Sequence, residues 1–135
     1  MGQQQLLLII LGVIVVGIAV AVGITMFQDN TVSANRDAVT NDLVNLASRA
    51  QQFYRRPTAL GGGGNSFVGL TADAAGLAKL TSKSTNANGT YSIMTAGSAT
   101  SVVVKGLGVE KGTDGNSIQV QMSVFSDSTY ATQTN

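Results

Sequence analysis

Apolar residues form one uninterrupted block near the start of the chain. Residues 6–27 contain no charged residue and no Asn, Gln or Pro, and they are followed at once by Gln28 and Asp29. At about 1.5 Å per residue, a helix over this block measures about 33 Å, which matches a hydrocarbon core of about 30 Å. The block therefore predicts a helix suited to a membrane or to the dry centre of an assembly.

After residue 28 the pattern changes from apolar on all sides to apolar on one side. Apolar residues recur three, four or seven positions apart, and charged residues and asparagines fall mostly between them. No Pro or Gly occurs between Gly23 and Pro57, so we expect a single helix from about residue 2 to about residue 55. Its apolar stripe is predicted to pack on a sheet through Val39, Leu43, Leu46, Ala50 and Phe53.

Two shorter features follow Pro57. The four consecutive glycines at 61–64 predict a wide surface loop with positive φ angles, because no Gly-Lys-Ser/Thr follows them and they do not follow a strand, as a phosphate-binding loop would. Thr71 is expected to cap a short helix beyond this loop. The apolar side of that helix comprises Ala74, Leu77, Ala78 and Leu80.

The remainder of the chain alternates apolar and polar residues, which is typical of half-buried strands. Strands are expected within residues 89–97, 100–110 and 116–126, separated by short polar turns that favour sequential antiparallel pairing. The clearest alternation places four apolar residues on one face of the third strand, at Ile118, Val120, Met122 and Val124. The tail after residue 126 must be held by strand pairing or by neighbouring molecules.

A sheet of three or four such strands needs an apolar cover, and the helical stripe is the only long one in the sequence. The predicted fold class is therefore α+β, with a long N-terminal helix packed on a small antiparallel sheet. Three segments follow from this pattern: an apolar helix over 1–28, its amphipathic continuation over 29–56, and a globular β-rich domain over 57–135.

The composition gives little support to catalysis. The chain has neither His nor Cys, which removes the commonest general base and the thiolate ligands, and we predict no catalytic, cofactor-binding or metal-binding residues. The net charge of +1 and a charged fraction of 11% indicate no basic surface for nucleic acid. Asp114, Asn116 and Asp127 match no calcium-loop pattern and are interpreted as turn residues. An enzyme is disfavoured.

The uncharged apolar block, the amphipathic helix that continues it, and the small antiparallel sheet together resemble the type IV pilin superfamily of bacterial pilins, pseudopilins and archaeal pilins. The resemblance implies a subunit held in the cytoplasmic membrane, processed by a prepilin peptidase, and assembled by pilus machinery into an extracellular filament of identical subunits. It also implies that the N-terminal helices form the filament core. The residues expected to pack there are Leu6, Leu7, Ile10, Ile14, Gly17, Ala21, Ile24 and Phe27.

The first residues depart from the family's pattern. Members usually have a leader ending in Gly and, at the fifth mature position, a Glu that pairs with a neighbour's amine. If Met1 is the mature start, that position is Gln5, and if Gly2 ends a leader, it is Leu7. The ion pair is lost either way, so we expect the amine, charged or uncharged and open to methylation, to lie among neutral oxygens rather than in a salt bridge. These polar contacts are expected from Met1, Gln3, Gln4 and Gln5.

Two alternatives stay open. Ala19-Val20-Ala21 has the form of a signal-peptidase site, although no basic residue precedes the apolar block and the block continues to Phe27. A membrane-anchored or secreted β-rich binding module that does not polymerise would show the same pattern. Asn88, in Asn-Gly-Thr, also fits the N-glycosylation pattern.

Overall fold

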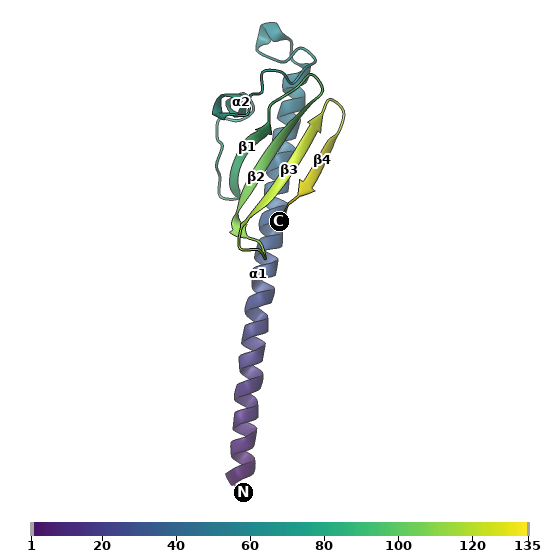
Figure 1. Cartoon of the computed structure of the whole chain (residues 1–135). Helices are drawn as coiled ribbons and strands as arrows, with labels where there is room; N and C mark the ends of the chain where they lie inside the picture. The colour runs from purple at the N-terminus through teal and green to yellow at the C-terminus, as the bar shows by residue number, and fades with distance from the viewer. Residues whose placement is uncertain (1, 135) are drawn as a thin grey trace.

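One helix of 54 residues carries a four-stranded antiparallel sheet on its C-terminal half (Figure 1). The structure, a computed structural model, describes residues 2–134. The α+β fold predicted from the sequence is confirmed. The elements are α1 (Gly2–Arg55), the 3-10 helix η1 (Thr58–Leu60), α2 (Ala74–Ala78), β1 (Gly89–Thr95), β2 (Ser101–Lys111), β3 (Ser117–Phe125) and β4 (Thr129–Gln133).

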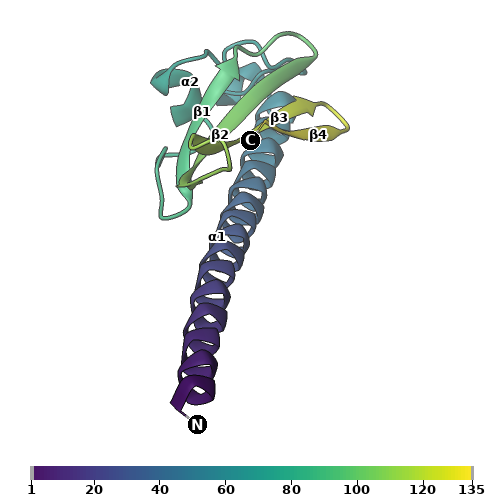
Figure 2. The ribbon, with the colours of Figure 1, turned by 60° about the horizontal axis from the view of Figure 1, so that its bottom comes forward.

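Helix α1 passes without a break from an apolar segment, residues 6–27, into the head, which we define as residues 28–134. At about 1.5 Å per residue it is about 80 Å long. Figure 2 shows the N-terminal half projecting beyond the sheet, with no other element beside it. The segment that is apolar on every side is therefore rigidly continuous with the segment that anchors the sheet.

The strands pair in chain order, β1-β2-β3-β4, each antiparallel to the next. The predicted alternation in β3 is confirmed, because Ile118, Val120, Met122 and Val124 are all buried. The C-terminal tail forms β4 and extends the ladder from the pair Val124 with Thr129 to the pair Val120 with Gln133. Strand pairing within the chain thus holds the tail.

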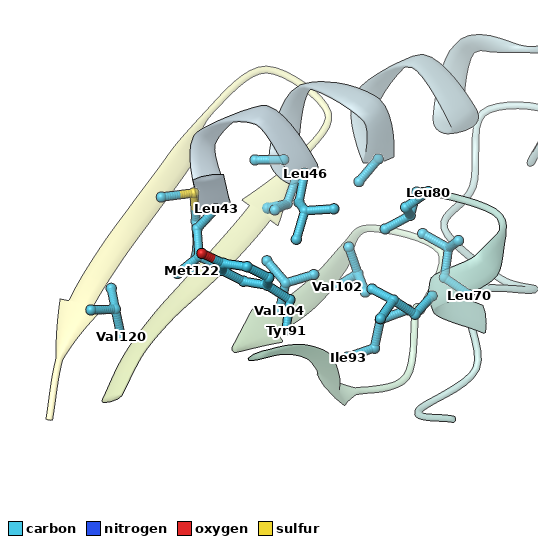
Figure 3. Close-up of a cluster of buried hydrophobic side chains, with 14 of the residues drawn as sticks. Leu43, Leu46, Leu70, Leu80, Tyr91, Ile93, Val102, Val104, Val120 and Met122 are labelled. Atoms are coloured by element: carbon cyan, nitrogen blue, oxygen red, sulfur yellow. The ribbon is translucent and has the colours of Figure 1, made fainter. Parts of the chain in front are cut away.

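The core lies between α1 and one face of the sheet. The residues of the predicted stripe are 0 to 7% exposed, namely Val39, Leu43, Leu46, Ala50 and Phe53. They share one apolar cluster with buried residues of β2 and β3, such as Val102, Val104 and Met122 (Figure 3). Toward the C-terminal end of α1 the cluster continues through the loop residues Phe67, Leu70 and Leu80. Half of one helix therefore supplies one whole side of the core.

Two glycines of β2 allow the helix to approach the sheet closely. A Cβ added at Gly106 would lie 2.6 Å from Cγ1 of Val39, and one added at Gly108 would lie 2.2 Å from Oδ1 of Asn35. Both distances are shorter than real Cβ atoms show, so the side chain of Val39 or Asn35 or the backbone would have to move. Helix α1 consequently packs directly on the backbone of β2 at this point.

The glycine run at 61–64 folds differently from the wide loop expected. The positive φ angles are present at Gly61 and Gly64, but the run turns back and donates hydrogen bonds to the last carbonyl oxygens of α1. The N–H of Gly63 donates to the carbonyl of Phe53 at 2.8 Å, and that of Gly64 donates to the carbonyl of Arg56, the residue after the helix, at 2.9 Å. These bonds satisfy carbonyls that a helix end leaves without partners. The predicted surface loop with positive φ angles is confirmed, but its hydrogen bonds to the helix end make it compact rather than wide.

The short helix α2 begins later than predicted. Its N-cap is Asp73, whose carboxylate accepts a hydrogen bond from the N–H of Gly76 at 2.8 Å. Thr71, the expected cap, instead donates its hydroxyl to the same carboxylate. Of the predicted apolar side only Leu77 and Leu80 are buried, while the two alanines, Ala74 and Ala78, are exposed.

Candidate functional site

The largest exposed apolar surface of the molecule is the segment of α1 over residues 6–27. Its large apolar side chains are 51 to 72% exposed, from Val22 at the lower limit to Phe27 at the upper one. Soluble monomers rarely leave contiguous apolar surface of this extent open to water. The segment is also the one span among the described residues that is long and apolar enough to cross a membrane, by length and composition. This surface requires a lipid or protein environment.

All eight residues predicted to pack in a filament core are exposed in the single chain: Leu6, Leu7, Ile10, Ile14, Gly17, Ala21, Ile24 and Phe27. Most of them follow a spacing of three or four residues, which places them along one side of α1. The opposite side is equally apolar, with Leu8, Val15 and Val22 also more than half exposed. The single chain therefore does not distinguish a preferred seam, and the assignment of these eight residues stays a prediction.

Two threonine hydroxyls of α1 are paired within the helix itself. The hydroxyl of Thr25 donates to the carbonyl of Ala21 at 3.1 Å, and that of Thr31 donates to the carbonyl of Phe27 at 2.8 Å. In a medium without water an unpaired hydroxyl is costly, and this back-bonding removes the cost. These two threonines are thus compatible with an apolar surrounding on the helix.

The three glycines of the apolar segment differ from those of the head. A Cβ added at Gly12, Gly17 or Gly23 would meet nothing within 4 Å. No contact within the chain therefore requires glycine at these positions, although glycine costs about 1 kcal/mol relative to alanine inside a helix. A requirement for glycine there would have to come from contacts with other molecules.

The expected N-terminal polar contacts fall in the first turns of α1. Gln3, Gln4 and Gln5 are helical and exposed, and the first turn of α1 holds no acidic residue. Met1 lies outside the described residues. Any partner for the glutamine side chains would be supplied by a neighbouring molecule.

A polar cluster on α1 ties the helix to the start of β1, and the sequence pattern did not reveal it. One oxygen of the Asp42 carboxylate accepts hydrogen bonds from Nδ2 of Asn86 at 2.8 Å, from Nδ2 of Asn88 at 2.9 Å and from the hydroxyl of Tyr91. Burial raises the pKa of the Asp42 carboxyl, but the bonds from Asn88, Tyr91 and Asn86 outweigh it and hold the pKa below its ordinary value. Burial, together with the neighbouring Asp42 carboxylate, raises the pKa of the Tyr91 hydroxyl.

Asn35 makes a second polar link between the helix and the sheet. This buried residue donates through Nδ2 to the carbonyl of Asn88 at 2.9 Å and accepts through Oδ1 from the N–H of Glu110 at 3.2 Å. Asn35 stands four residues before Val39, on the apolar stripe. A polar residue at a core position was the signal that could have identified it.

The side chain of Asn88, the possible glycosylation site, is hydrogen-bonded within the protein. Its Nδ2, the atom that would carry a glycan, donates to Asp42 at 2.9 Å. Its backbone carbonyl accepts the bond from Asn35. A glycan at this position would take one of the two Nδ2 hydrogens and would have to fit beside the Asp42 carboxylate.

The turn residues considered for calcium do not come together as a ligand set. Asp114 accepts from the N–H of Asn116 at 3.0 Å and from its Nδ2 at 2.9 Å, closing the turn between β2 and β3. Asp127 lies in the other turn, between β3 and β4. Among the residues that the structure describes, no group of three acidic, His or Cys side chains is positioned to hold a metal ion.

The geometry as a whole is pilin-like: a long helix, apolar over its first half, packed through its second half against a four-stranded antiparallel sheet. No family model, no curated protein and no solved structure matches the chain.

Proposed function

We propose that the protein is the structural subunit of a type IV pilus-like extracellular filament. In this proposal the apolar segment holds the subunit in the cytoplasmic membrane before assembly. It then packs among the same segments of other copies, while the heads face outward on the filament surface. The prepilin peptidase and assembly machinery of such systems would be its partners. The proposal assigns the protein a structural role and no catalytic chemistry.

One observation carries the proposal. The apolar segment is exposed on every side and is a rigid extension of the helix that forms the core of the head. Fully burying a Leu, Ile or Val side chain contributes about 1.5 to 3 kcal/mol, so more than ten such residues supply a large driving force for association. Rigid continuity means that packing the segments also fixes the positions of the heads. A simple anchor does not require that continuity.

The competing function is a membrane-anchored binding module that does not polymerise. The length and apolar composition of α1, which suffice to cross a membrane, fit this anchor as well as they fit a filament subunit. The two functions differ in what the apolar segment contacts in the final state. A polymer buries it against other copies, whereas an anchor leaves it in lipid.

The experiment compares material sheared from cells that express the native chain with material from cells that express Val16→Asp. We expect the native chain to give filaments visible by electron microscopy. We expect Val16→Asp to give none, because a buried carboxylate among apolar helices is costly. Met94→Asp, at an exposed position of β1 in the head, serves as the charge-matched control and should still assemble.

Native subunits that stay entirely in the membrane fraction, with no sheared polymer, would favour the anchor. Filaments from Val16→Asp equal to those of the native chain would place the subunit contacts elsewhere in the molecule.

A further inference from the structure

The head carries opposite charges at its two ends along α1. We call the end where α1 leaves the head the neck, which includes the turn between β2 and β3 (Figure 1). Four carboxylates lie there, on Asp29, Asp37, Glu110 and Asp114. The neck also holds two cations, on Arg36 and Lys111. Acidic side chains thus outnumber basic ones at this end.

The opposite end, which we call the apex, surrounds the C-terminus of α1. Its four cations are on Arg49, Arg55, Arg56 and Lys79. Two carboxylates lie at the same end, on Asp73, which caps α2, and on Asp127, in the turn between β3 and β4. Here basic side chains are in excess. The near-zero net charge of the chain therefore conceals a separation of charge along its axis.

Three of the apex cations line one hollow. We call it the basic hollow, and its lining includes Arg49, Arg56 and Lys79, together with Gln52 and the ring of Phe53. No carboxylate lies among these lining residues, all of which the structure describes. Positive side chains placed together without an acidic partner repel one another, so an anion is favoured there.

The known contacts of these cations are with neutral groups. Arg49 donates to the carbonyl of Leu80 at 2.9 Å, and Lys79 donates to the carbonyl of Gly69 at 2.6 Å. The ammonium of Lys79 also lies 5.9 Å from the ring centroid of Phe53. These contacts hold the two side chains in place. The Asp73 carboxylate, outside the lining, offsets part of the charge of Lys79, and the lining itself keeps an excess of positive charge.

We infer that the basic hollow receives the acidic neck of a second copy of this chain, placed one head length further along the filament axis. Asp29 and Arg55, the residue next to Arg56, are 26 residues apart on α1, or about 39 Å. A copy shifted by about that distance brings its neck to the apex of the copy below. Its apolar segment then runs beside the head half of the lower helix. This inference rests on the proposed function, because it presumes that copies stack along a common axis.

A second copy is favoured over other anions by complementarity. The surface that the hollow needs already exists on the same molecule, at the opposite end and with the opposite sign of charge. Repeating one such contact between unlike ends generates an open filament. An unrelated anionic polymer would not account for the acidic neck.

The test measures the critical concentration of assembly by sedimentation, after detergent is removed from the full-length chain. The apex variant combines Arg56→Glu with Lys79→Glu. The neck variant combines Asp29→Lys with Asp37→Lys. A quadruple variant carries all four substitutions. The control, Lys105→Glu, changes the net charge by half as much and lies in the middle of β2, away from the basic hollow and the neck.

We expect the apex variant to raise the critical concentration about fivefold or more, because attraction between two pairs becomes repulsion. The critical concentration of the quadruple variant should return to within about twofold of the native value, and that of the control should stay within about twofold of it. The difference between the native chain and the apex variant should shrink at about 1 M salt, where the screening length falls to about 3 Å.

Equal assembly of the native chain and the apex variant overturns the inference and leaves the proposed function intact. A weakened apex variant that the neck changes do not rescue also overturns it, and indicates that the hollow holds another anion. Failure of the native chain itself to assemble would instead count against the proposed function.

Discussion

Replacing Leu43 with alanine tests the packing of α1 on the sheet most severely. Leu43 is 0% exposed and lies in the middle of the apolar cluster that joins α1 to β2 and β3 (Figure 3). The substitution removes three carbon atoms and leaves a cavity that the sheet, held by its own ladder, cannot fully close. Comparable changes cost about 2 to 5 kcal/mol. Since domains of this size are stable by about 5 to 15 kcal/mol, the loss would be a large part of the total.

The measurement is urea unfolding of a chain that starts at Gln28, which removes the apolar segment and the need for detergent. With a slope of about 2 kcal/mol per molar urea, a loss of about 3 kcal/mol lowers the midpoint by about 1.5 M. Val44→Ala is the matched control, because Val44 is the next residue on the same helix and is 47% exposed. It should change the stability by less than about 0.5 kcal/mol.

The reasoning would be refuted if the two variants had the same midpoint. A cost below about 1 kcal/mol for Leu43→Ala would show that the stripe is not packed on the sheet.

Further predictions concern the links between α1 and the sheet. Because the pKa of Asp42 is lowered on folding, its carboxylate stabilises the head above about pH 4 and this contribution is lost as the pH falls below that value. Unfolding measured against pH should therefore show a smaller acid-induced loss for Asp42→Asn than for the native head, and parallel profiles would contradict the hydrogen-bond network. Gly108→Ala should destabilise the head by about 1 to 3 kcal/mol, because the new methyl would collide with Asn35. Gly12→Ala, where a methyl meets nothing, should leave the unfolding of the head in the full-length chain unchanged, and an equal effect of both substitutions would refute the argument from close approach.

Periodicity was sufficient to predict the helix and the core face of the sheet. The apolar stripe from Val39 to Phe53 and the alternation from Ile118 to Val124 each repeat with the period of their own structure. Such patterns arise because one side of an element is buried along its whole length. In a helix that side returns at every turn, and in a strand at every second residue. The extent of α1 followed from the absence of Pro and Gly between Gly23 and Pro57.

Contacts between distant residues could not be predicted in the same way. Asp42 and Tyr91 are 49 positions apart, and no local pattern indicates that they meet. The compact glycine run depends on the position of the carbonyls of Phe53 and Arg56, which is known only once the chain has turned back. The cap of α2 was misplaced because both Thr71 and Asp73 are acceptable N-cap residues, and the tertiary position of the helix selected the later one.

The central claim is that the apolar segment forms the core of a polymer, and a cryo-electron microscopy map of sheared filaments tests it most directly. The account predicts a central bundle of helices in which residues 6–27 of each subunit are buried against the same residues of other copies, with the heads outside. A map in which the heads stack on one another while these residues lie at the periphery would contradict the account.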